Sequence, residues 1–405
     1  MFASYSIRRY NVGMVENPAN DQEVVPAKKL RRRRWFQFSL RTLMIFTLIC
    51  AVASAWLGMK IDRKRKEREA VEAIGKLGGK VAYDYDQMIG GKPPGPDWLR
   101  HLFGENLFSE VVEVDLHAAS NVTDAELEHV KALTHLQRLN LTGARITDAG
   151  LVNLERLTEL QGLVLDNTNI TDDELVHFKG LTRLERLNLG GTNISDIGLK
   201  RLTQFTRLQG IVLNDTIVTD AGMQHLKQLT QLDFLDLHHT NVTDAGVEDL
   251  KGLKQLAVLQ LGDTKITDAG LAKLKGLDKL RGLFLIGTKV TDAGLIHLQE
   301  LPSLTTLFLG GNKITDVGMA NLKNLSGLVQ LHIGTTNVSD AGLESLKGLT
   351  KLQILDLQET NLTDAGLKQL RGLTQLDSLD LRKTKVTDAG VKKIQTALPN
   401  CKISR

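Results

Sequence analysis

The chain has 405 residues, of which 42% are apolar and 24% charged, and it contains only two cysteines. This composition is typical of a globular protein and gives no disulfide framework. The net charge of +4 is unevenly spread, with +7 on residues 1–110 and −3 on residues 111–405, which excludes a basic nucleic-acid-binding domain in the larger part.

The first predicted element is a membrane-spanning helix. Residues 42–59 carry no charge, and as a helix they extend ~27 Å, close to the ~30 Å of a hydrocarbon core. Arg41 and Lys60 flank this run, and Trp35 and Trp56 lie near its ends, where interfacial aromatic residues are common. We therefore predict an uncleaved signal-anchor helix over residues 42–59, preceded by a basic, disordered tail over residues 1–41.

A cleavable signal peptide is the alternative, because residues 51–53 and 53–55 have the small-residue pattern of cleavage sites. The long segment before the apolar run favours the anchor. Basic residues occur on both sides, at 28–34 and at 60–68, so the positive-inside count is almost balanced. We place the N-terminus inside the cell and the large domain on the non-cytoplasmic side of a single-pass membrane protein.

Residues 60–110 are predicted to form a juxtamembrane helix and an N-terminal cap. The pattern favours a helix over 62–77 that Gly78 and Gly79 end, and a strand over 80–86. Asp97 is expected to start a short helix that carries Trp98, and the aromatic residues of this segment are expected to seal the first repeat behind it.

From residue 111 onward the chain repeats every 24 residues. An aspartate marks the period: Asp124, Asp148, Asp172, Asp196, Asp220, Asp244, Asp268, Asp292, Asp316, Asp340, Asp364 and Asp388. Alternating leucines such as Leu283 and Leu285 precede the aspartate and indicate a strand, whereas the spacing of Leu295, Leu298 and Leu301 after it indicates a short helix. Single units cannot bury these leucines alone, so the repeats must stack.

The pattern therefore predicts an α/β solenoid in the form of a horseshoe, with about twelve 24-residue repeats over residues 111–398. The strands form a parallel sheet on the concave side, and short helices cover the convex side. Residues 399–405 begin one more strand and serve as the C-terminal cap.

The repeated aspartate is interpreted as structural. In two units, Thr123 with Glu126 and Thr171 with Glu174 match the capping box, which makes the Thr or Ser before each aspartate the N-cap. The aspartate then occupies the first helical position, where it faces the positive end of the helix dipole. No second carboxylate or histidine recurs beside it, so the pattern does not favour a metal site or a catalytic acid. The glycine that replaces Glu in the other ten units is not explained by this pattern.

A second repeated column places threonine where each strand turns toward its helix. Its members are Thr168, Thr192, Thr216, Thr240, Thr264, Thr288, Asn312, Thr336, Thr360 and Thr384. We expect these side chains to be buried and to satisfy backbone groups of the turn. Ala144 interrupts the column and predicts a weaker turn there.

Catalytic motifs are absent from the sequence. It contains no G-x-S-x-G, no P-loop, no H-E-x-x-H and no C-x-x-C. Asp236, His238, His239 and Asp263 are expected to be solvated polar residues rather than metal ligands. We therefore predict no enzyme activity, no metal and no cofactor.

The variable strand positions face the concave surface and are mostly polar. The middle of the array differs, because apolar side chains occupy outward positions that we expect on five successive strands: Phe234, Val258, Phe284, Ile286 and Phe308. The scaffold does not require these side chains, and exposed apolar clusters often mark interaction sites. We predict a partner-binding site here. Large side chains that only fill a closed concave face are the alternative.

Several stretches carry a resemblance to a known group. They are RRRRWFQFSLRTLM, RKRKEREAVEAIGKLGG with YDYD after it, VVEVDL, the TDAGL repeats and the terminal LPNCKI. Together they resemble the membrane-anchored leucine-rich repeat proteins of planctomycete bacteria, over residues 28–405. The repeats are also similar to those of internalins and of F-box leucine-rich repeat substrate receptors, although no F-box is recognisable.

The resemblance implies an architecture rather than an activity. The leading hypothesis is a membrane-anchored binding module that presents its concave face to a protein or a glycan. One alternative is a structural surface protein that associates with its own copies. Another is a substrate-recognition receptor of a ubiquitin-ligase-like or signalling complex. None of these involves nucleic acid.

Overall fold

The computed structural model describes residues 39–87, 91–98, 100, 104, 106–117, 119 and 122–405, and the chain divides into two compact units, Met1–Leu57 and Gly58–Arg405. All but the last three residues of the expected tail over 1–41 lie outside the described residues. The predicted cleavage sites at 51–53 and 53–55 fall within the helix α1 (Leu40–Lys76).

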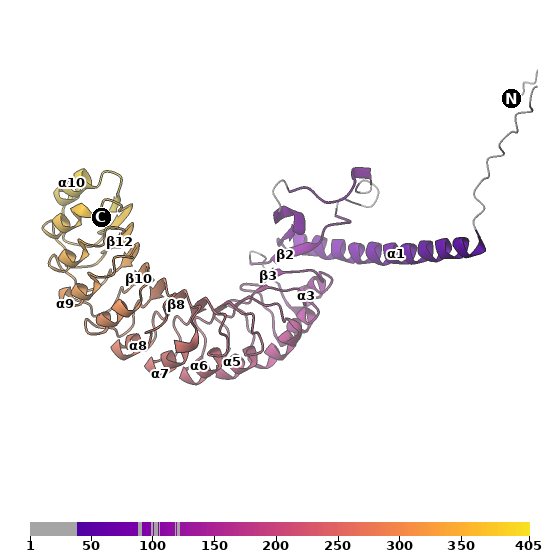
Figure 1. Ribbon diagram of the computed structural model, residues 1–405, viewed down its shortest axis with the longest axis horizontal. Coiled ribbons are helices and arrows are strands. Elements are labelled where there is room, and N and C mark those ends of the chain that lie inside the picture. Colours follow the sequence, from indigo (N-terminus) through magenta and orange to yellow (C-terminus); the bar gives the residue numbers. More distant parts are fainter. Residues whose placement is uncertain are drawn as a thin grey trace, which may run out of the picture. The chain divides into compact units, whose positions relative to one another are not determined.

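Helix α1 begins in the first unit and ends in the second (Figure 1). It contains an 18-residue window that is long and apolar enough to cross a membrane, and none of this window is buried. Met44 and Phe46, for example, are 64% and 63% exposed. A signal sequence near the N-terminus can form a helix of this kind as well. The helix predicted over 62–77 is the last part of α1 rather than a separate element.

The end of α1 closes the first repeat of the second unit. Ala70 and Ile74 are buried in the core of the repeats. The helix ends where the Gly79 N–H donates to the Ile74 carbonyl at 3.0 Å and Gly78 adopts a φ of 84°, a left-handed conformation that glycine accepts without steric cost. This confirms the predicted stop signal.

The segment after α1 is only partly as expected. Strand β1 (Lys80–Tyr83) is followed by the 3-10 helix η1 (Asp84–Gln87), so the strand is shorter than predicted. Tyr83 packs against the core. Trp98, however, is 66% exposed, so the prediction that it seals the first repeat is wrong. The apolar face of α1 covers that repeat instead.

Among its described residues, the second unit contains one sheet of 14 strands in sequence order. Strand β1 pairs antiparallel with β2, and every later neighbour is parallel, with each residue paired to the residue 24 positions on from β3 to β14. After β1 the strands are β2 (Val111–Asp115), β3 (Arg138–Asn140), β4 (Gly162–Val164), β5 (Arg186–Asn188), β6 (Gly210–Val212), β7 (Phe234–Asp236), β8 (Val258–Gln260), β9 (Gly282–Phe284), β10 (Thr306–Phe308), β11 (Gln330–His332), β12 (Ile354–Asp356), β13 (Ser378–Asp380) and β14 (Lys402–Ser404).

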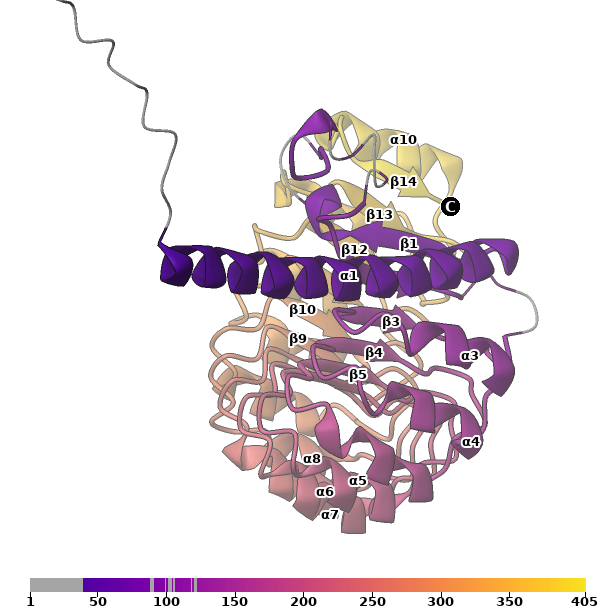
Figure 2. The same ribbon diagram turned by 90° about the vertical axis from the view of Figure 1, so that its right-hand side faces the viewer.

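Short helices follow the strands and lie on the outer side of the arc, with the strands on its inner side (Figures 1 and 2). They are α3 (Asp124–Val130), α4 (Asp148–Leu151), η2 (Val152–Leu154), η3 (Asp173–Gly180), α5 (Asp196–Leu202), α6 (Asp220–Leu226), α7 (Asp244–Val247), η4 (Glu248–Gly252), α8 (Asp268–Ala272), η5 (Gly294–Glu300), α9 (Asp316–Met319), η6 (Ala320–Leu322), η7 (Gly342–Leu346), η8 (Gly366–Gly372) and α10 (Asp388–Ala397). We call each strand with its following helices a coil and name it by its strand.

Each coil buries the predicted leucines. In the β9 coil, Leu283, Leu285, Leu295 and Leu298 have no exposed surface, and Leu301 is 2% exposed. A row of such side chains runs without interruption through all the coils as one core. This arrangement, a parallel concave sheet with short convex helices, is the predicted solenoid. The final strand β14 confirms the strand expected before the C-terminus.

The repeated aspartate joins neighbouring coils. In the β6 coil, Oδ1 of Asp220 accepts the N–H of Thr243 at 2.7 Å, and Oδ2 of Asp220 accepts the hydroxyl of Thr243 at 2.6 Å. Thr243 is the N-cap of the next coil, and its hydroxyl accepts the N–H of Ala245. The predicted capping role of Thr is confirmed, but the aspartate does more than face its own helix dipole, because it fixes the cap of the following coil.

Ten junctions contain this two-bond bridge, with aspartate-to-amide distances of 2.7–2.8 Å. The acceptors and donors are Asp124–Thr147, Asp172–Ser195, Asp196–Thr219, Asp220–Thr243, Asp244–Thr267, Asp268–Thr291, Asp292–Thr315, Asp316–Ser339, Asp340–Thr363 and Asp364–Thr387. Since residues 122–405 are all described, the junction between Asp148 and Thr171 is the single exception in the array.

The bridge also explains the glycine two residues after each aspartate. A Cβ at Gly246 would lie 2.6 Å from Asp220 Oδ1, closer than real Cβ atoms approach, and the other bridged coils are similarly crowded. Glu occurs at this position only in two coils. Glu126 is in the first coil, which has no preceding aspartate, and Glu174 follows the exceptional junction.

The threonine column has the predicted role. The hydroxyl of Thr264, for example, donates to the carbonyl of Leu261 at 2.6 Å, and its side chain is buried. Asn312 uses its amide in the same way and bonds to the carbonyls of both Leu285 and Leu309. Ala144 occupies the column without a side-chain hydrogen bond, so the carbonyl of its turn is satisfied by the backbone alone.

Candidate binding surface

The concave surface is built from the first and third residues of each strand. The middle residue is a buried leucine or isoleucine in β3 to β13, while its two neighbours are at most partly buried in nearly every strand. Because consecutive strands pair without any slip, equivalent residues of successive coils lie beside one another in straight columns. Side chains at these positions are therefore free of the core and define what the surface can contact.

Four of the five predicted site residues lie on four neighbouring strands, β7 to β10, and the fifth, Ile286, lies beyond the end of β9, so the expected five strands are wrong. We call the five residues the aromatic patch. Phe234 pairs in register with Val258, in the first column. Phe284 and Phe308 pair in the third-residue column. Ile286 follows β9 by two residues and is 40% exposed.

The two columns of the patch meet over a glycine. A Cβ at Gly282 would lie 3.3 Å from the Phe284 ring and 3.5 Å from Val258. The Phe284 ring therefore occupies the space that a side chain at position 282 would fill. The Phe284 and Phe308 rings stack with centroids 4.5 Å apart, and the Phe308 ring stacks on His332 at 3.8 Å. Sequence reasoning missed His332 as a neighbour of the patch because it counted only apolar residues.

Polar side chains border the patch on the side of the C-terminus. His332 Nδ1 is 3.5 Å from an oxygen of Asp356, and Arg382 binds Asp380 at 2.6 Å. The hydrogen bond from Arg382 holds the pKa of Asp380 below its usual value. The patch thus has a charged margin on this side, and a polar margin beside an apolar centre is usual at protein-binding surfaces.

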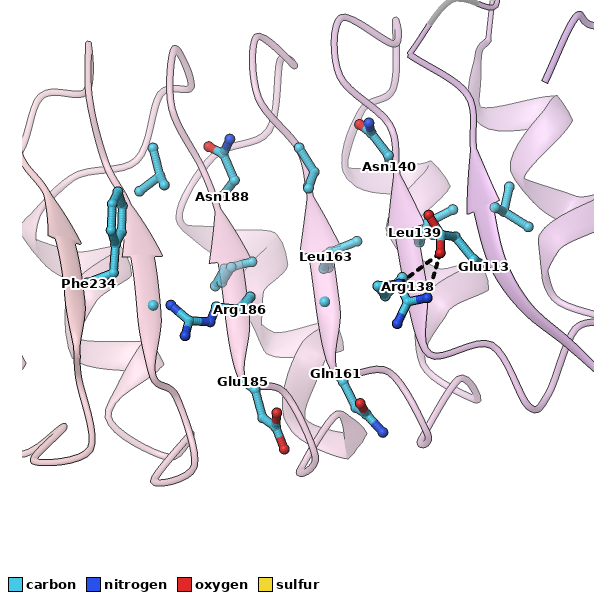
Figure 3. A pocket seen from close by; sticks show the side chains of 16 residues that line it. Glu113, Arg138, Leu139, Asn140, Gln161, Leu163, Glu185, Arg186, Asn188 and Phe234 are labelled. Atoms are coloured by element: carbon cyan, nitrogen blue, oxygen red, sulfur yellow. Dashed lines mark hydrogen bonds and ion pairs between the residues drawn. The ribbon is translucent and has the colours of Figure 1, made fainter. Parts of the chain in front are cut away.

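A hollow of about 590 Å³ lies on the concave face between β2 and β7 (Figure 3). Gly162 and Gly210 stand in the first-residue column there and add no side chains to its lining. Arg138 and Arg186 lie on either side of β4. Arg138 pairs with Glu113 at 2.6 Å, and Arg186 makes two bonds to Asp233, at 2.8 and 2.9 Å.

Gly210 is needed for the reach of Arg186. A Cβ at this position would lie 2.8 Å from the Cδ of Arg186. The Arg186 side chain crosses β6 and binds Asp233, the residue directly before β7. Phe234 lines the far side of the hollow, so the hollow and the aromatic patch share this residue. Sequence reasoning missed the hollow. Its signal was the pair of glycines, Gly162 and Gly210, on either side of Arg186 in the first-residue column.

The histidine cluster forms separate pairs. His239 pairs with Asp215, whose hydrogen bond raises the pKa of His239, and His238 lies 3.6 Å from Asp263. Burial raises the pKa of Asp236, which accepts the His238 N–H. No group of three His, Cys, Asp or Glu side chains suited to a metal ion occurs within the part of the chain that the structure describes.

Comparisons with known proteins agree with this geometry. The family model "Leucine rich repeat" matches residues 134–194 and 302–362. No curated protein matches the chain. Among solved structures, an internalin (InlF) from Listeria monocytogenes is 27% identical, with a TM-score of 0.52 over 69% of this chain and 88% of the internalin.

Two other solved structures are similar. A leucine-rich repeat protein from Leptospira interrogans is 21% identical, with a TM-score of 0.52 over 69% of this chain and 74% of its own. A second Listeria monocytogenes internalin (InlC2) is 28% identical, with a TM-score of 0.40 over 55% and 88%. The second unit of this chain is therefore a solenoid of leucine-rich repeats, similar in structure to the internalin InlF, and such solenoids typically act as interaction scaffolds rather than enzymes.

Proposed function

We propose that this protein is a membrane-anchored binding module, held by residues 42–59, that binds a protein partner through the aromatic patch. The observation that carries the proposal is the stacked, half-buried pair of Phe284 and Phe308 on a surface that the core does not require. Rigid aromatic side chains contribute most of the binding energy at many protein interfaces, and they do so when a polar margin excludes water around them.

The anchor rests on the exposed apolar window of α1 and on the resemblance to the membrane-anchored repeat proteins of planctomycete bacteria. Arg41 and Lys60 bracket the span at distances that suit the two interfaces. With the N-terminus inside, the concave face meets partners on the non-cytoplasmic side.

The test of partner binding uses the full chain in detergent as bait against proteins of its own cells. We expect one stoichiometric partner that the double variant Phe284→Ser/Phe308→Ser loses. The matched control is Ile296→Ser/Val317→Ser, because these apolar side chains are also exposed, by 46% and 74%, but lie on the convex helices η5 and α9. Retention of the partner by the concave variant, or its loss from both variants, contradicts the proposal.

Two further outcomes identify the other functional classes. If the bait recovers only its own copies, the protein is a self-assembling surface protein. If a glycan rather than a protein competes for the Phe284 and Phe308 surface, the ligand class is wrong although the site is right.

Anchoring and sidedness need separate measurements. We expect the mature protein to keep its full N-terminal sequence and to stay in the membrane pellet after alkaline extraction. A mature chain that starts after Ala53 or Ala55 identifies a signal peptide instead. Protease added to intact cells is expected to cleave the repeats, and protection of the repeats until the cells are permeabilised reverses the proposed orientation.

A further inference from the structure

We propose that the junction between the β3 and β4 coils is a proton-dependent joint of the solenoid, in which Asp148 and Glu174 share a proton and hold the coils together more firmly in mildly acidic conditions than at neutral pH. The inference does not depend on the proposed function. It concerns the single junction of the array that departs from the common bridge.

The departure is visible in the hydrogen bonds. At the ten other junctions the aspartate accepts both the N–H and the hydroxyl of the next cap. Here the hydroxyl of Thr171 donates to Glu174 Oε2 at 2.6 Å, and Asp148 Oδ1 is buried without a hydrogen-bond partner. The helix that follows, η3, begins one residue later than most helices of the array, and its N-cap Asp172 makes no side-chain cap bond. The hydroxyl bond of the bridge is therefore missing, and the backbone N–H of Thr171 is what remains of the contact between Asp148 and this cap.

The cause is the residue at position 174. At the position equivalent to 174, glycine occurs in every other coil that has a repeated aspartate in the coil before it. A Cβ at this position would contact the carboxylate of that preceding coil. Glu174 has that Cβ, and its own carboxylate takes the place of the aspartate at Thr171. The carboxyl groups of Asp148 and Glu174 consequently come within hydrogen-bonding reach of each other.

Neighbouring charges do not neutralise this pair. On the preceding helix, Asp124 uses both oxygens on Thr147. On the same turn, Asp172 uses both oxygens on Ser195 and Asp173 pairs with Arg201 of α5 at 2.7 Å. His177 of η3 pairs with Glu155 at 2.5 Å. Among the described residues, no Lys or Arg forms an ion pair with Asp148 or Glu174, so a proton is the available counter-charge.

Two carboxyl groups in contact, that of the buried Glu174 and that of the half-buried Asp148, cannot both be charged at low cost. Burial and the neighbouring Glu174 raise the pKa of Asp148 to about 6. Burial also opposes the charge of Glu174, but the hydrogen bonds from Thr171 and Asp148 outweigh it and lower its pKa. The two carboxyl groups thus titrate as a pair that holds one proton between them.

The sign of the pH effect follows from these directions. The junction is closed when the two coils are packed together and open when they separate. The pKa of the carboxyl group is higher in the closed junction, so a bound proton stabilises the closed junction. This stabilisation is lost as the pH rises through about 6. Glu174 stays charged over this range because its pKa is lowered. Between about pH 7.5 and about pH 5.5, one proton bound with a pKa near 6 changes the opening equilibrium about fourfold.

Hydrogen exchange of the full chain in detergent measures this opening. Mass spectrometry of peptides over residues 166–175 reports the exceptional junction, and peptides over 190–199 and 214–223 report the matched junctions of Ser195 and Thr219. After correction for intrinsic exchange rates, we expect the protection of 166–175 relative to the two matched segments to rise about fourfold from about pH 7.5 to about pH 5.5.

Two variants decide the mechanism. Glu174→Gly creates the residue found at the bridged junctions and is expected to give protection that no longer depends on pH in this range. Glu174→Gln keeps the length of the side chain but replaces the carboxyl group with an amide whose N–H does not titrate. We expect the same loss of pH dependence, and this variant decides the question if the glycine variant does not fold. A constant ratio in the unchanged protein, or an unchanged pH dependence in the variant that folds, overturns the proposal.

Discussion

Asp220 holds Thr243 of the next coil by two hydrogen bonds, one to the amide at 2.7 Å and one to the hydroxyl at 2.6 Å. The carboxylate thereby satisfies a backbone donor at the start of one helix and orients the side chain that caps the next donor. Helix caps of this kind are usually local to one helix. Here the cap depends on the preceding coil, so helix formation and coil stacking are coupled at every bridged junction.

Replacing one bridging aspartate should therefore weaken the whole array. We expect Asp244→Asn to lower the free energy of unfolding by about 1–3 kcal/mol. The carboxylate accepts the two bonds from Thr267 with two charged oxygens, whereas the amide has one neutral oxygen and loses the charge-assisted contact. Urea unfolding of the full chain in detergent, followed by circular dichroism, measures this loss. The control is Asp388→Asn, since Asp388 has no following cap and pairs only with Arg405 on the surface. Equal losses in both variants contradict the bridge as the source of stability.

The glycine column gives a second test. Gly270→Ala places a Cβ against Asp244 and is expected to cost about 1–3 kcal/mol through overpacking. Gly252→Ala has nothing within 4 Å of the added Cβ, and its expected effect is neutral or slightly stabilising. The same urea titration compares the two. If Gly252→Ala is the more destabilising change, steric crowding by the carboxylate is not the reason for the glycine.

The interruption at Ala144 predicts a stabilising substitution. Ala144→Thr restores the hydroxyl that in other coils donates to the leucine carbonyl three residues earlier, here Leu141, and should add about 0.5–1.5 kcal/mol. The reverse change in an intact coil, Thr264→Ala, is expected to lose a similar amount. Opposite signs for the two variants confirm the role of the column, and equal signs refute it.

The buried lysine of the N-terminal cap predicts a large effect from a single charge. Lys64 binds Glu67 at 2.8 Å and Glu110 at 2.9 Å, and only 6% of its side chain is exposed. Lys64→Met leaves Glu67 without its cation in a buried site and should cost about 3–5 kcal/mol.

The double variant Lys64→Met/Glu67→Leu removes both charges and is expected to recover most of that loss, because Glu110 keeps Arg63 as a partner at 2.6 Å. Unfolding in urea compares the two variants. No recovery in the double variant means that Lys64 acts through packing rather than through its charge.

A last prediction separates the binding surface from the core. Phe308→Ser should change the free energy of unfolding by less than about 1.5 kcal/mol, because the ring is only partly buried on the concave face. Phe178→Ser should cost about 3–5 kcal/mol, because Phe178 is fully buried. If the Phe308 variant is as unstable as the Phe178 variant, the patch is part of the core and the proposed interface loses its support.

The repeat itself was predictable because its period is fixed and its leucines are spaced for a strand and then for a short helix. The role of Gly246 and its equivalents was not, because the group that excludes a side chain there belongs to the preceding coil and is 26 residues away in the sequence. The two Glu residues, Glu126 and Glu174, looked alike as capping boxes. Only the stacking distinguishes a first coil from an interrupted junction.

The candidate site was predictable in part. The outward direction of Phe284 and Phe308 follows from strand alternation, but their ring stacking and the contribution of His332 depend on how far neighbouring side chains lean. The hollow near Gly162 and Gly210 depends on the absence of side chains at these two positions and on the course of the Arg186 side chain over Gly210. Trp98 was misjudged because aromatic character alone does not indicate which side of a cap a residue occupies.

Each bridging aspartate joins its own coil to the coil that follows it in the chain. Every bridged coil has the same aspartate as acceptor and the same glycine, which leaves room for the carboxylate of the coil before it. A segment of 24 residues beginning and ending within such coils is therefore interchangeable with its neighbours. Tandem duplication or deletion of one of them alters the length of the array and leaves all its joints intact. The coil that contains Glu174 is the exception, since a second copy would carry its mismatched junction to a new place, so growth of this protein by unequal recombination is expected on the C-terminal side of residue 174.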